Sequence, residues 1–202
     1  DTDRSRGLGD VYKRQLYAPS RDQEKAKEYL ATALSELGCT VDDLSAHLSI
    51  DCGDSPTSIA EASFYQEQWR QVLGIEVAVN SMITKQGSQN RKTGNYVMSI
   101  TGWGPDYNDP NTFLDMWVTD GGNNQTGFSN ERYDELIDLA AKETDLEKRE
   151  SYFIECEQII ADQLPIGPAF WRASSYACSD KIKGGMHRST FQDINAVYVK
   201  LS

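Results

Sequence analysis

Apolar residues recur every three or four positions in two stretches of the first half of the chain, which is the spacing of helices with one buried face. The first stretch covers residues 20–37, where Ser20 is suited to cap the first turn, and it ends before Gly38. The second stretch covers residues 56–73 and ends before Gly74. The pattern therefore predicts two helices, each closed by a glycine.

Shorter apolar segments lie between and after these helices. Residues 44–50 alternate between apolar and polar side chains, the period of a half-buried strand, and residues 75–79 and 96–100 are short apolar runs. The polar residues 85–95 indicate a loop or a frayed helix. Because helices and strands alternate, we expect an α/β layer in which ligands bind beyond the carboxyl ends of the strands.

The second half of the chain contains two more helical patterns and a tail of different character. Residues 133–140 and 144–164 keep a helical period, and Pro165 stops the second pattern. Residues 167–177 and 196–201 indicate strands. These tail strands have no evident partner strands in the preceding segments, so we expect them to belong to another domain.

Composition limits the classes of function. The chain has 202 residues and a formal charge of -11, and no cluster of Lys and Arg offers a surface for nucleic acid. No apolar run reaches the length that spans a membrane. The segment 1–15 mixes charges and glycines without an apolar core. We interpret it as a leader foreign to the protein and not as a signal peptide.

The four cysteines are far apart in the sequence. Cys39, Cys52, Cys156 and Cys178 form no closely spaced pair of the kind that zinc sites use. Cys156 lies on the apolar face of a predicted helix, which favours a buried free thiol. We therefore predict that the cysteines are buried free thiols, with no metal site and no cofactor.

The segment TGWGPDYNDPNTF, residues 101–113, has the most unusual composition in the chain. Gly102 and Gly104 add little bulk on either side of Trp103, so another backbone can approach closely. The two prolines of the segment restrict its backbone. We expect a stiff, extended edge beside an aromatic wall.

Two carboxylates of this segment invite different interpretations. Asp106 projects from a stiff backbone, which suits a cationic group of a ligand. Asp109 precedes a proline and is better explained as the cap of a helical segment over residues 112–117. The residues alone are compatible with two interpretations of Trp103 and Asp106, a binding site or a turn.

A series of motifs in this order resembles one known family, the extracytoplasmic solute-binding proteins of family 5, which include the oligopeptide-binding and dipeptide-binding proteins of ABC importers. The motifs are Gln68–Trp69 with Leu73–Gly74–Ile75, then GWGPDYNDPNTFL, SNERYDELIDLA, an aromatic helix over Arg149 to Glu157, ADQLPIGPAFW and Lys183–Gly184. The resemblance covers about residues 16–202 and the C-terminal part of those proteins.

The resemblance implies a periplasmic-binding-protein-like α/β lobe, with a mixed sheet flanked by helices, from a protein of two lobes that closes on its ligand. Residues 16–176 are then the second lobe, and residues 177–202 hold C-terminal strands that return to the first lobe. The leader, residues 1–15, belongs to neither lobe.

The resemblance also implies which residues bind the ligand. In the family, the aspartate of a Trp-x-x-Asp element pairs with the α-ammonium group of a peptide, and this role falls on Asp106. Some members place an arginine before the tryptophan for the peptide carboxylate, but Ile100 and its neighbours offer none. The candidate ligand-binding residues are Gly102, Trp103, Gly104, Asp106, Tyr107 and Asn108.

The function implied is capture of an oligopeptide or dipeptide for an ABC transporter membrane permease, by a monomeric, extracytoplasmic protein that is not an enzyme. It would act in the periplasm or at the cell surface, with a lipid anchor as one option. A non-peptide solute such as an oligosaccharide, a nickel chelate or haem is the alternative, and a sensory receptor of the same fold is another. A carbohydrate hydrolase that uses Asp106 and Asp109 is a remote alternative.

Overall fold

The computed structural model describes residues 22–170, 178–184, 187–188, 194–195 and 199–200. The proposed leader and the predicted cap at Ser20 lie outside this part of the chain. The chain divides into two compact units, Asp1–Thr101 and Gly102–Ser202. Each unit is described by itself.

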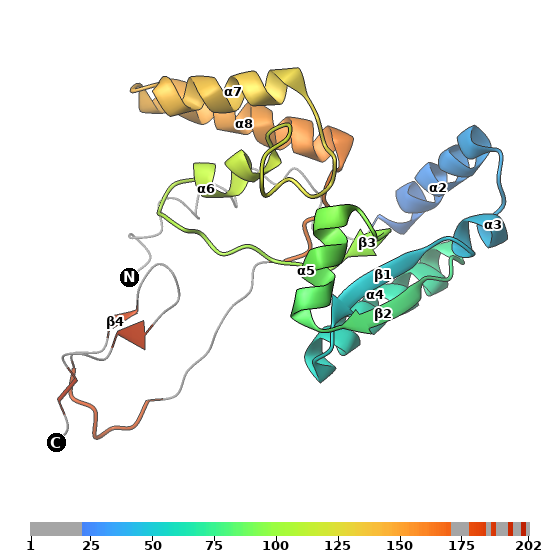
Figure 1. The fold of residues 1–202 in the computed structure, drawn as a ribbon, viewed down its shortest axis with the longest axis horizontal. Helices are drawn as coiled ribbons and strands as arrows, with labels where there is room; N and C mark the ends of the chain where they lie inside the picture. Colours follow the sequence, from blue (N-terminus) through green and yellow to red (C-terminus); the bar gives the residue numbers. More distant parts are fainter. Residues whose placement is uncertain (1–21, 171–177, 185–186, 189–193, 196–198, 201–202) are drawn as a thin grey trace. The chain divides into compact units, whose positions relative to one another are not determined.

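The first unit contains a parallel sheet of three strands (Figure 1). The strands are β1 (Ser49–Gly53), β2 (Ala78–Met82) and β3 (Met98–Ser99), in the order β2-β1-β3. Ile50 of the central strand lies opposite Val79 on one side and Met98 on the other. Parallel strands joined through helices confirm the predicted α/β class.

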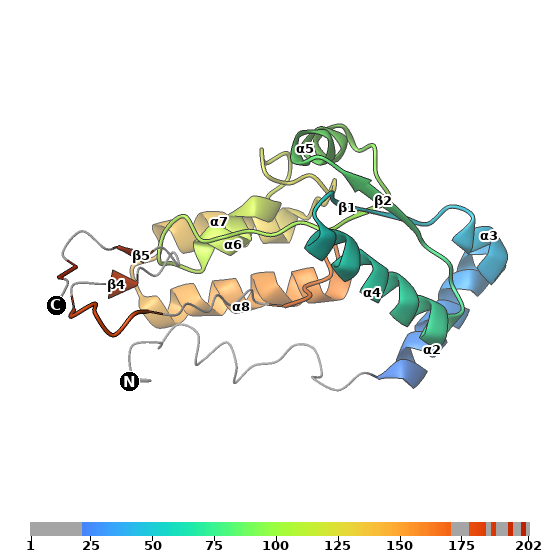
Figure 2. The same cartoon turned by 90° about the horizontal axis from the view of Figure 1, so that it is seen from below.

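The helices in the described residues of this unit are α2 (Gln23–Leu37), α3 (Val41–Ser45), α4 (Pro56–Leu73) and α5 (Thr84–Thr93). Figure 2 shows α4 and α5 on opposite sides of the sheet. The predicted glycine endings are confirmed, because Gly38 and Gly74 adopt left-handed backbone angles with φ of 64° and 70°. The caps at the other ends are Asp22 for α2 and Ser55 for α4.

Three predicted boundaries in this unit need correction. The strand expected over residues 44–50 begins only at Ser49, because a capping box between Thr40 and Asp43 starts the short helix α3. The segment 85–95 is the helix α5 for most of its length. The strand expected over residues 75–79 begins at Ala78.

The core of the first unit lies between the sheet and α4. Its buried members are Ile50, Cys52, Ala62 and Val77. Partly buried side chains, among them Trp69 of α4, pack around them. The amide nitrogen Nε2 of Gln66 donates to the carbonyl oxygen of Val77 at 2.6 Å, which ties α4 to the chain entering β2.

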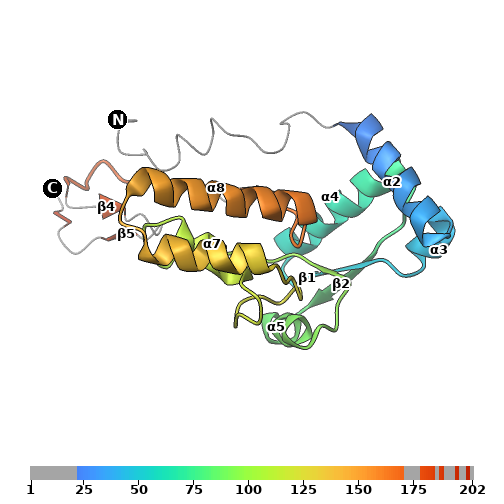
Figure 3. The same ribbon diagram turned by 90° about the horizontal axis from the view of Figure 1, so that it is seen from above.

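The second unit is built on two long helices, α7 (Glu131–Lys142) and α8 (Leu146–Gln163), which lie side by side in Figure 3. Asn130 and Asp145 cap them, and α8 ends before Pro165 as predicted. A short helix α6 (Asn111–Leu114) and a 3₁₀ turn η1 (Asp115–Trp117) precede them. The shared core is Leu114, Tyr133, Leu136, Ile137, Ala140, Phe153, Cys156 and Ile160.

The tail contributes a small antiparallel pair of strands, β4 (His187–Arg188) and β5 (Ile194–Asn195). The strand expected over residues 167–177 is irregular at 167–170, and its remainder lies outside the described residues, as does most of 196–201. Among the described helices, none is both long enough and apolar enough to cross a membrane.

Candidate ligand-binding site

The sequence GWGPDYNDP, residues 102–110, forms an irregular segment at the start of the second unit. Gly102, Trp103 and Gly104 are exposed, and 41% of the Trp103 surface is accessible. Nothing lies within 4 Å of the position that a Cβ at Gly104 would occupy. An exposed indole flanked by bare backbone can receive both an apolar group and another main chain.

Asp106 is exposed, and its backbone is held while its carboxylate faces solvent. Its backbone N–H donates to the hydroxyl oxygen of Thr112 at 3.0 Å, and Thr112 is only 2% exposed. Within the described residues, the Asp106 carboxylate has no recorded hydrogen bond or ion pair. A held backbone with an exposed carboxylate suits a cation brought by a ligand.

The carboxylate of Asp109 accepts hydrogen bonds from within the protein. Both of its carboxylate oxygens accept from the guanidinium of Arg149, at 2.6 and 2.9 Å, and one of them also accepts from the backbone N–H of Asn111 at 2.9 Å. The predicted cap of the helical segment is wrong, because α6 has Pro110 at its N-cap and no side-chain cap bond, and the Asp109 carboxylate instead bonds the Asn111 backbone and Arg149, which was not anticipated. The hydrogen bonds from Arg149 hold the pKa of Asp109 below its ordinary value, so this carboxyl is unsuited to act as the acid of a hydrolase.

Tyr107 and Asn108, the last two predicted site residues, are both exposed. The Tyr107 hydroxyl donates to the carboxylate of Asp115 at 3.1 Å and accepts from the Asn111 side chain at 3.0 Å. Partial burial, followed by the neighbouring carboxylate of Asp115, raises the pKa of Tyr107. Tyr107 therefore remains a neutral side chain that is held in place, and the residue is 42% exposed.

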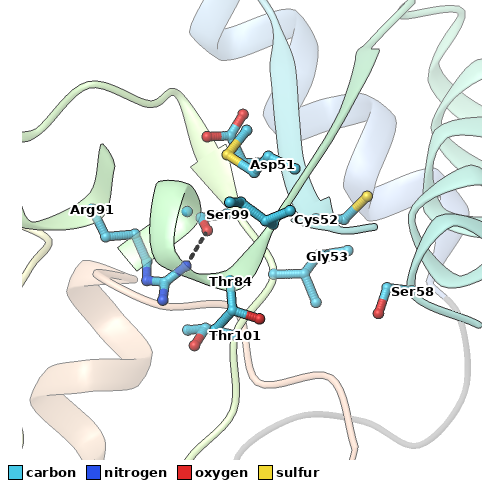
Figure 4. A pocket seen from close by; sticks show the side chains of 12 residues that line it. Asp51, Cys52, Gly53, Ser58, Thr84, Arg91, Ser99 and Thr101 are labelled. Atoms are coloured by element: carbon cyan, nitrogen blue, oxygen red, sulfur yellow. Dashed lines mark hydrogen bonds between the residues drawn. The ribbon is translucent and has the colours of Figure 1, made fainter. Parts of the chain in front are cut away.

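The first unit has a cavity of its own where the three parallel strands end (Figure 4), the position predicted from the α/β pattern. Its volume is about 210 Å³. Arg91 of α5 donates to the Ser99 hydroxyl at 3.3 Å across this cavity, and Asp51 is buried at its edge with Asn80 and Asn90 as hydrogen-bond donors. The lining residues are Asp51, Cys52, Gly53, Ser58, Met82, Ile83, Thr84, Gly87, Arg91, Ser99, Ile100 and Thr101.

Sequence reasoning missed the residues that support the site. Thr112 and Arg149 were not singled out as site residues, since the composition around Thr112 does not reveal its bond to the Asp106 backbone and Arg149 is forty positions from its partner. Arg91 was missed because the segment around it was expected to be a loop or a frayed helix. One signal was available for Thr112, an expected helical segment that starts just after a proline.

The cysteines and acidic residues form no metal centre within the part of the chain that is described. The four cysteines are free thiols. Cys52 and Cys156 are buried, Cys39 is partly buried and Cys178 is exposed, so the expectation of buried thiols is confirmed for two of them and wrong for Cys178.

Residues 8–125 match the family described as bacterial extracellular solute-binding proteins, family 5 middle. The chain belongs to this family. It is a family of binding proteins rather than enzymes, as the resemblance implied.

Among its relatives, the chain is 33% identical over 176 residues to the oligopeptide-binding protein OppA of Bacillus subtilis, covering 83% of this chain and 31% of that protein. It is 32% identical over 196 residues to the dipeptide-binding protein of Lactococcus lactis subsp. cremoris, covering 94% and 35%. A solved structure of Listeria monocytogenes OppA bound to peptide is 28% identical, with a TM-score of 0.74 and coverage of 90% and 34%. The chain thus spans about a third of the length of the curated relatives it matches.

Proposed function

We propose that this chain supplies one wall of a peptide-binding site, in which Asp106 pairs with the α-ammonium group of the ligand. The observation that carries the proposal is the state of Asp106, whose backbone N–H is bonded to the buried Thr112 while its side chain stays exposed. Among the described residues this carboxylate has no partner, so it can bind an ammonium group without first breaking an ion pair with one of them.

The neighbouring residues fit the rest of a peptide. The exposed backbone around Gly102 and Gly104 offers N–H and C=O groups to an extended main chain, a mode that is independent of the peptide's side chains. Trp103 gives an apolar surface next to it. Tyr107 and Asn108 extend the wall with polar groups. Binding through groups that all peptides share favours tolerance of peptide sequence.

The protein that carries this sequence would then be the solute-binding component of an ABC importer and would deliver its ligand to a membrane permease. It would act as a monomer outside the cytoplasm, where a lipid anchor can hold it. Residues 16–176 would form the second lobe and residues 177–202 would return to the first. The family match and the names of the relatives support the assignment as a solute-binding component. They do not support residues 8–15 as part of a foreign leader, because the family match begins at residue 8.

The test is calorimetry of the complete protein that carries this sequence, with tri-alanine and N-acetyl-tri-alanine as probes. Loss of a charge-assisted hydrogen bond is worth about 1.5–3 kcal/mol, so Asp106→Asn should weaken tri-alanine binding by about 10-fold to 150-fold. Acetylation of the peptide amine should weaken binding to the unaltered protein by a similar factor.

Asp120→Asn is the matched control, because Asp120 is exposed and its left-handed backbone, with φ of 57°, accepts asparagine readily. It should leave both affinities unchanged. Equal affinity of Asp106→Asn and the unaltered protein for tri-alanine would refute the proposal. Binding of an oligosaccharide in place of both peptides would favour the non-peptide alternative, in which Trp103 stacks on a sugar.

A further inference from the structure

We propose that Arg149 is a positioning residue for the carboxylate of Asp106. This inference rests on the proposed function. Arg149 does not reach the ligand in this proposal. It holds Asp109, three positions after Asp106 in the sequence, and so fixes the segment from which the ligand-binding carboxylate projects.

The contact between Arg149 and Asp109 is bidentate. Nη1 of Arg149 lies 2.6 Å from Oδ2 of Asp109, and Nη2 lies 2.9 Å from Oδ1. Two parallel hydrogen bonds fix orientation as well as distance. The two side chains are 23% and 28% exposed, so solvent screens the pair only in part. The hydrogen bonds raise the pKa of Arg149 and lower the pKa of Asp109, so both groups are charged near neutral pH.

The guanidinium is itself immobilised by the core of the second unit. Its Nε donates to the carbonyl oxygen of Ala140 at 3.0 Å, and its central carbon lies 4.6 Å from the ring centroid of Phe153. Ala140 and Phe153 are buried core residues of α7 and α8. Asp109 is therefore held to a fixed point of the helical core, and not to a side chain that moves with the segment.

Local hydrogen bonds carry this constraint to Asp106. The backbone N–H of Asp109 donates to the carbonyl oxygen of Tyr107 at 3.0 Å, and its carboxylate accepts from the backbone of Asn111 at 2.9 Å. The N–H of Asp106 donates to the Thr112 hydroxyl at 3.0 Å. Asp106 thus lies in a closed turn that is anchored at Asp109, and displacement of Asp109 shifts the carboxylate that meets the ligand.

Arg149 also has an electrostatic consequence. It neutralises Asp109, which leaves Asp106 as the carboxylate available to an ammonium group in this turn. Removal of Arg149 alone would leave the Asp109 carboxylate unpaired. This second anion would then attract cations away from Asp106. The informative variant therefore removes both charges of the pair, Arg149→Met combined with Asp109→Asn.

The experiment measures, for the complete protein, the ratio of affinities for tri-alanine and N-acetyl-tri-alanine. The unaltered protein should prefer the free amine by at least about 10-fold, the scale of one charge-assisted hydrogen bond. The neutral double variant should lose most of this preference and fall within about 3-fold. Arg149→Lys keeps the charge but loses the bidentate geometry, and should give an intermediate ratio.

Arg132→Met is the matched control, because Arg132 also bonds a carboxylate on α8, that of Glu155, while its hydrogen bonds among the described residues go to Glu155 and Glu135 and not to the turn. It should lower thermal stability and leave the ratio of the two affinities unchanged.

An unchanged ratio in the neutral double variant would overturn the inference. The proposed function would still stand if Asp106→Asn abolished the preference for the free amine. An unchanged ratio in Asp106→Asn would instead refute the proposed function. If circular dichroism shows the double variant unfolded, the ratio of Arg149→Lys decides: a value equal to that of the unaltered protein overturns the inference.

Discussion

Thr112 accepts a hydrogen bond from the backbone N–H of Asp106 at 3.0 Å, and Thr112 is 2% exposed. An exposed residue of the candidate site is thus tied to a buried side chain. Because a buried hydroxyl has few alternative partners, its orientation is fixed, and so is the backbone that it bonds.

Replacement of this hydroxyl gives the first prediction. Thr112→Val keeps the shape of the side chain but removes the acceptor, and should lower the free energy of unfolding by about 1 kcal/mol. It should also weaken tri-alanine binding, because the turn that presents Asp106 loosens. Urea unfolding of this chain and calorimetry of the complete protein measure the two effects. Thr112→Ser retains the hydroxyl, and the account is wrong if it weakens binding as much as valine does.

Tyr133 provides a test of the core that supports this turn. Its side chain is fully buried, and its hydroxyl donates to the carbonyl oxygen of Leu114 at 2.6 Å. Burial raises the pKa of this phenol, so it remains a donor. Tyr133→Phe should destabilise the chain by about 1–3 kcal/mol, because the carbonyl of Leu114 loses its donor. Tyr152→Phe, at a partly buried position, is the control and should cost less in the same urea titration. Equal stability of Tyr133→Phe and the unaltered chain would contradict the role of this bond.

The Asp109–Arg149 ion pair predicts a dependence of stability on pH. The folded pKa of Asp109 is lowered, chiefly by the hydrogen bonds from Arg149, relative to an unfolded value of about 3.9. The stabilisation is therefore fully present above about pH 4, and is lost as pH falls through the folded pKa. The gap in unfolding free energy between the unaltered chain and Asp109→Asn should narrow on acidification.

Unfolding titrations at a series of acidic pH values measure this gap. Thr112→Val serves as the comparison, because neither its valine nor the threonine it replaces titrates. A gap for Asp109→Asn that stays constant from neutral to strongly acidic pH would show that the carboxylate contributes no charge-dependent stability.

The cysteines should differ in reactivity. Cys156 is fully buried, and burial raises the pKa of its thiol to about 12, while burial and then Asp51 raise the pKa of Cys52. Because thiol reagents attack the thiolate, exposed Cys178 should be labelled first, and these two only after unfolding. Mass spectrometry of labelled peptides gives the order, and labelling in urea is the control. Early labelling of Cys156 would contradict the core that places it between α7 and α8.

The elements that the sequence predicted well are those fixed by nearby residues. Gly38 and Gly74 end their helices because a left-handed residue is needed where each helix stops, which is local chemistry. The strand expected over residues 44–50 failed for the same kind of reason, since Thr40 and Asp43 form a capping box that the alternation does not reveal. The helix α5 lacks an apolar stripe, and a contact from Asn90 to Asp51 ties it to the sheet.

The residues of the candidate site also differ in whether nearby sequence predicts them. Trp103 and Asp106 are recognisable from composition and from the family motif, because the stiff segment that carries them is continuous in sequence. Arg149 lies on α8 and bonds Asp109 of the turn before α6. Only the packing of α8 brings the two residues together. Asp106, the residue proposed to bind the ligand, was therefore predictable as a candidate, whereas Thr112 and Arg149, which fix its segment, were not.

The most direct test of the account is a crystal structure of the complete protein with tri-alanine bound. We predict that the ligand's α-ammonium nitrogen lies within about 2.7–3.2 Å of a carboxylate oxygen of Asp106, with Trp103 beside the peptide. A bound peptide whose amine meets other groups, while the Asp106 carboxylate points away from it, would contradict the account.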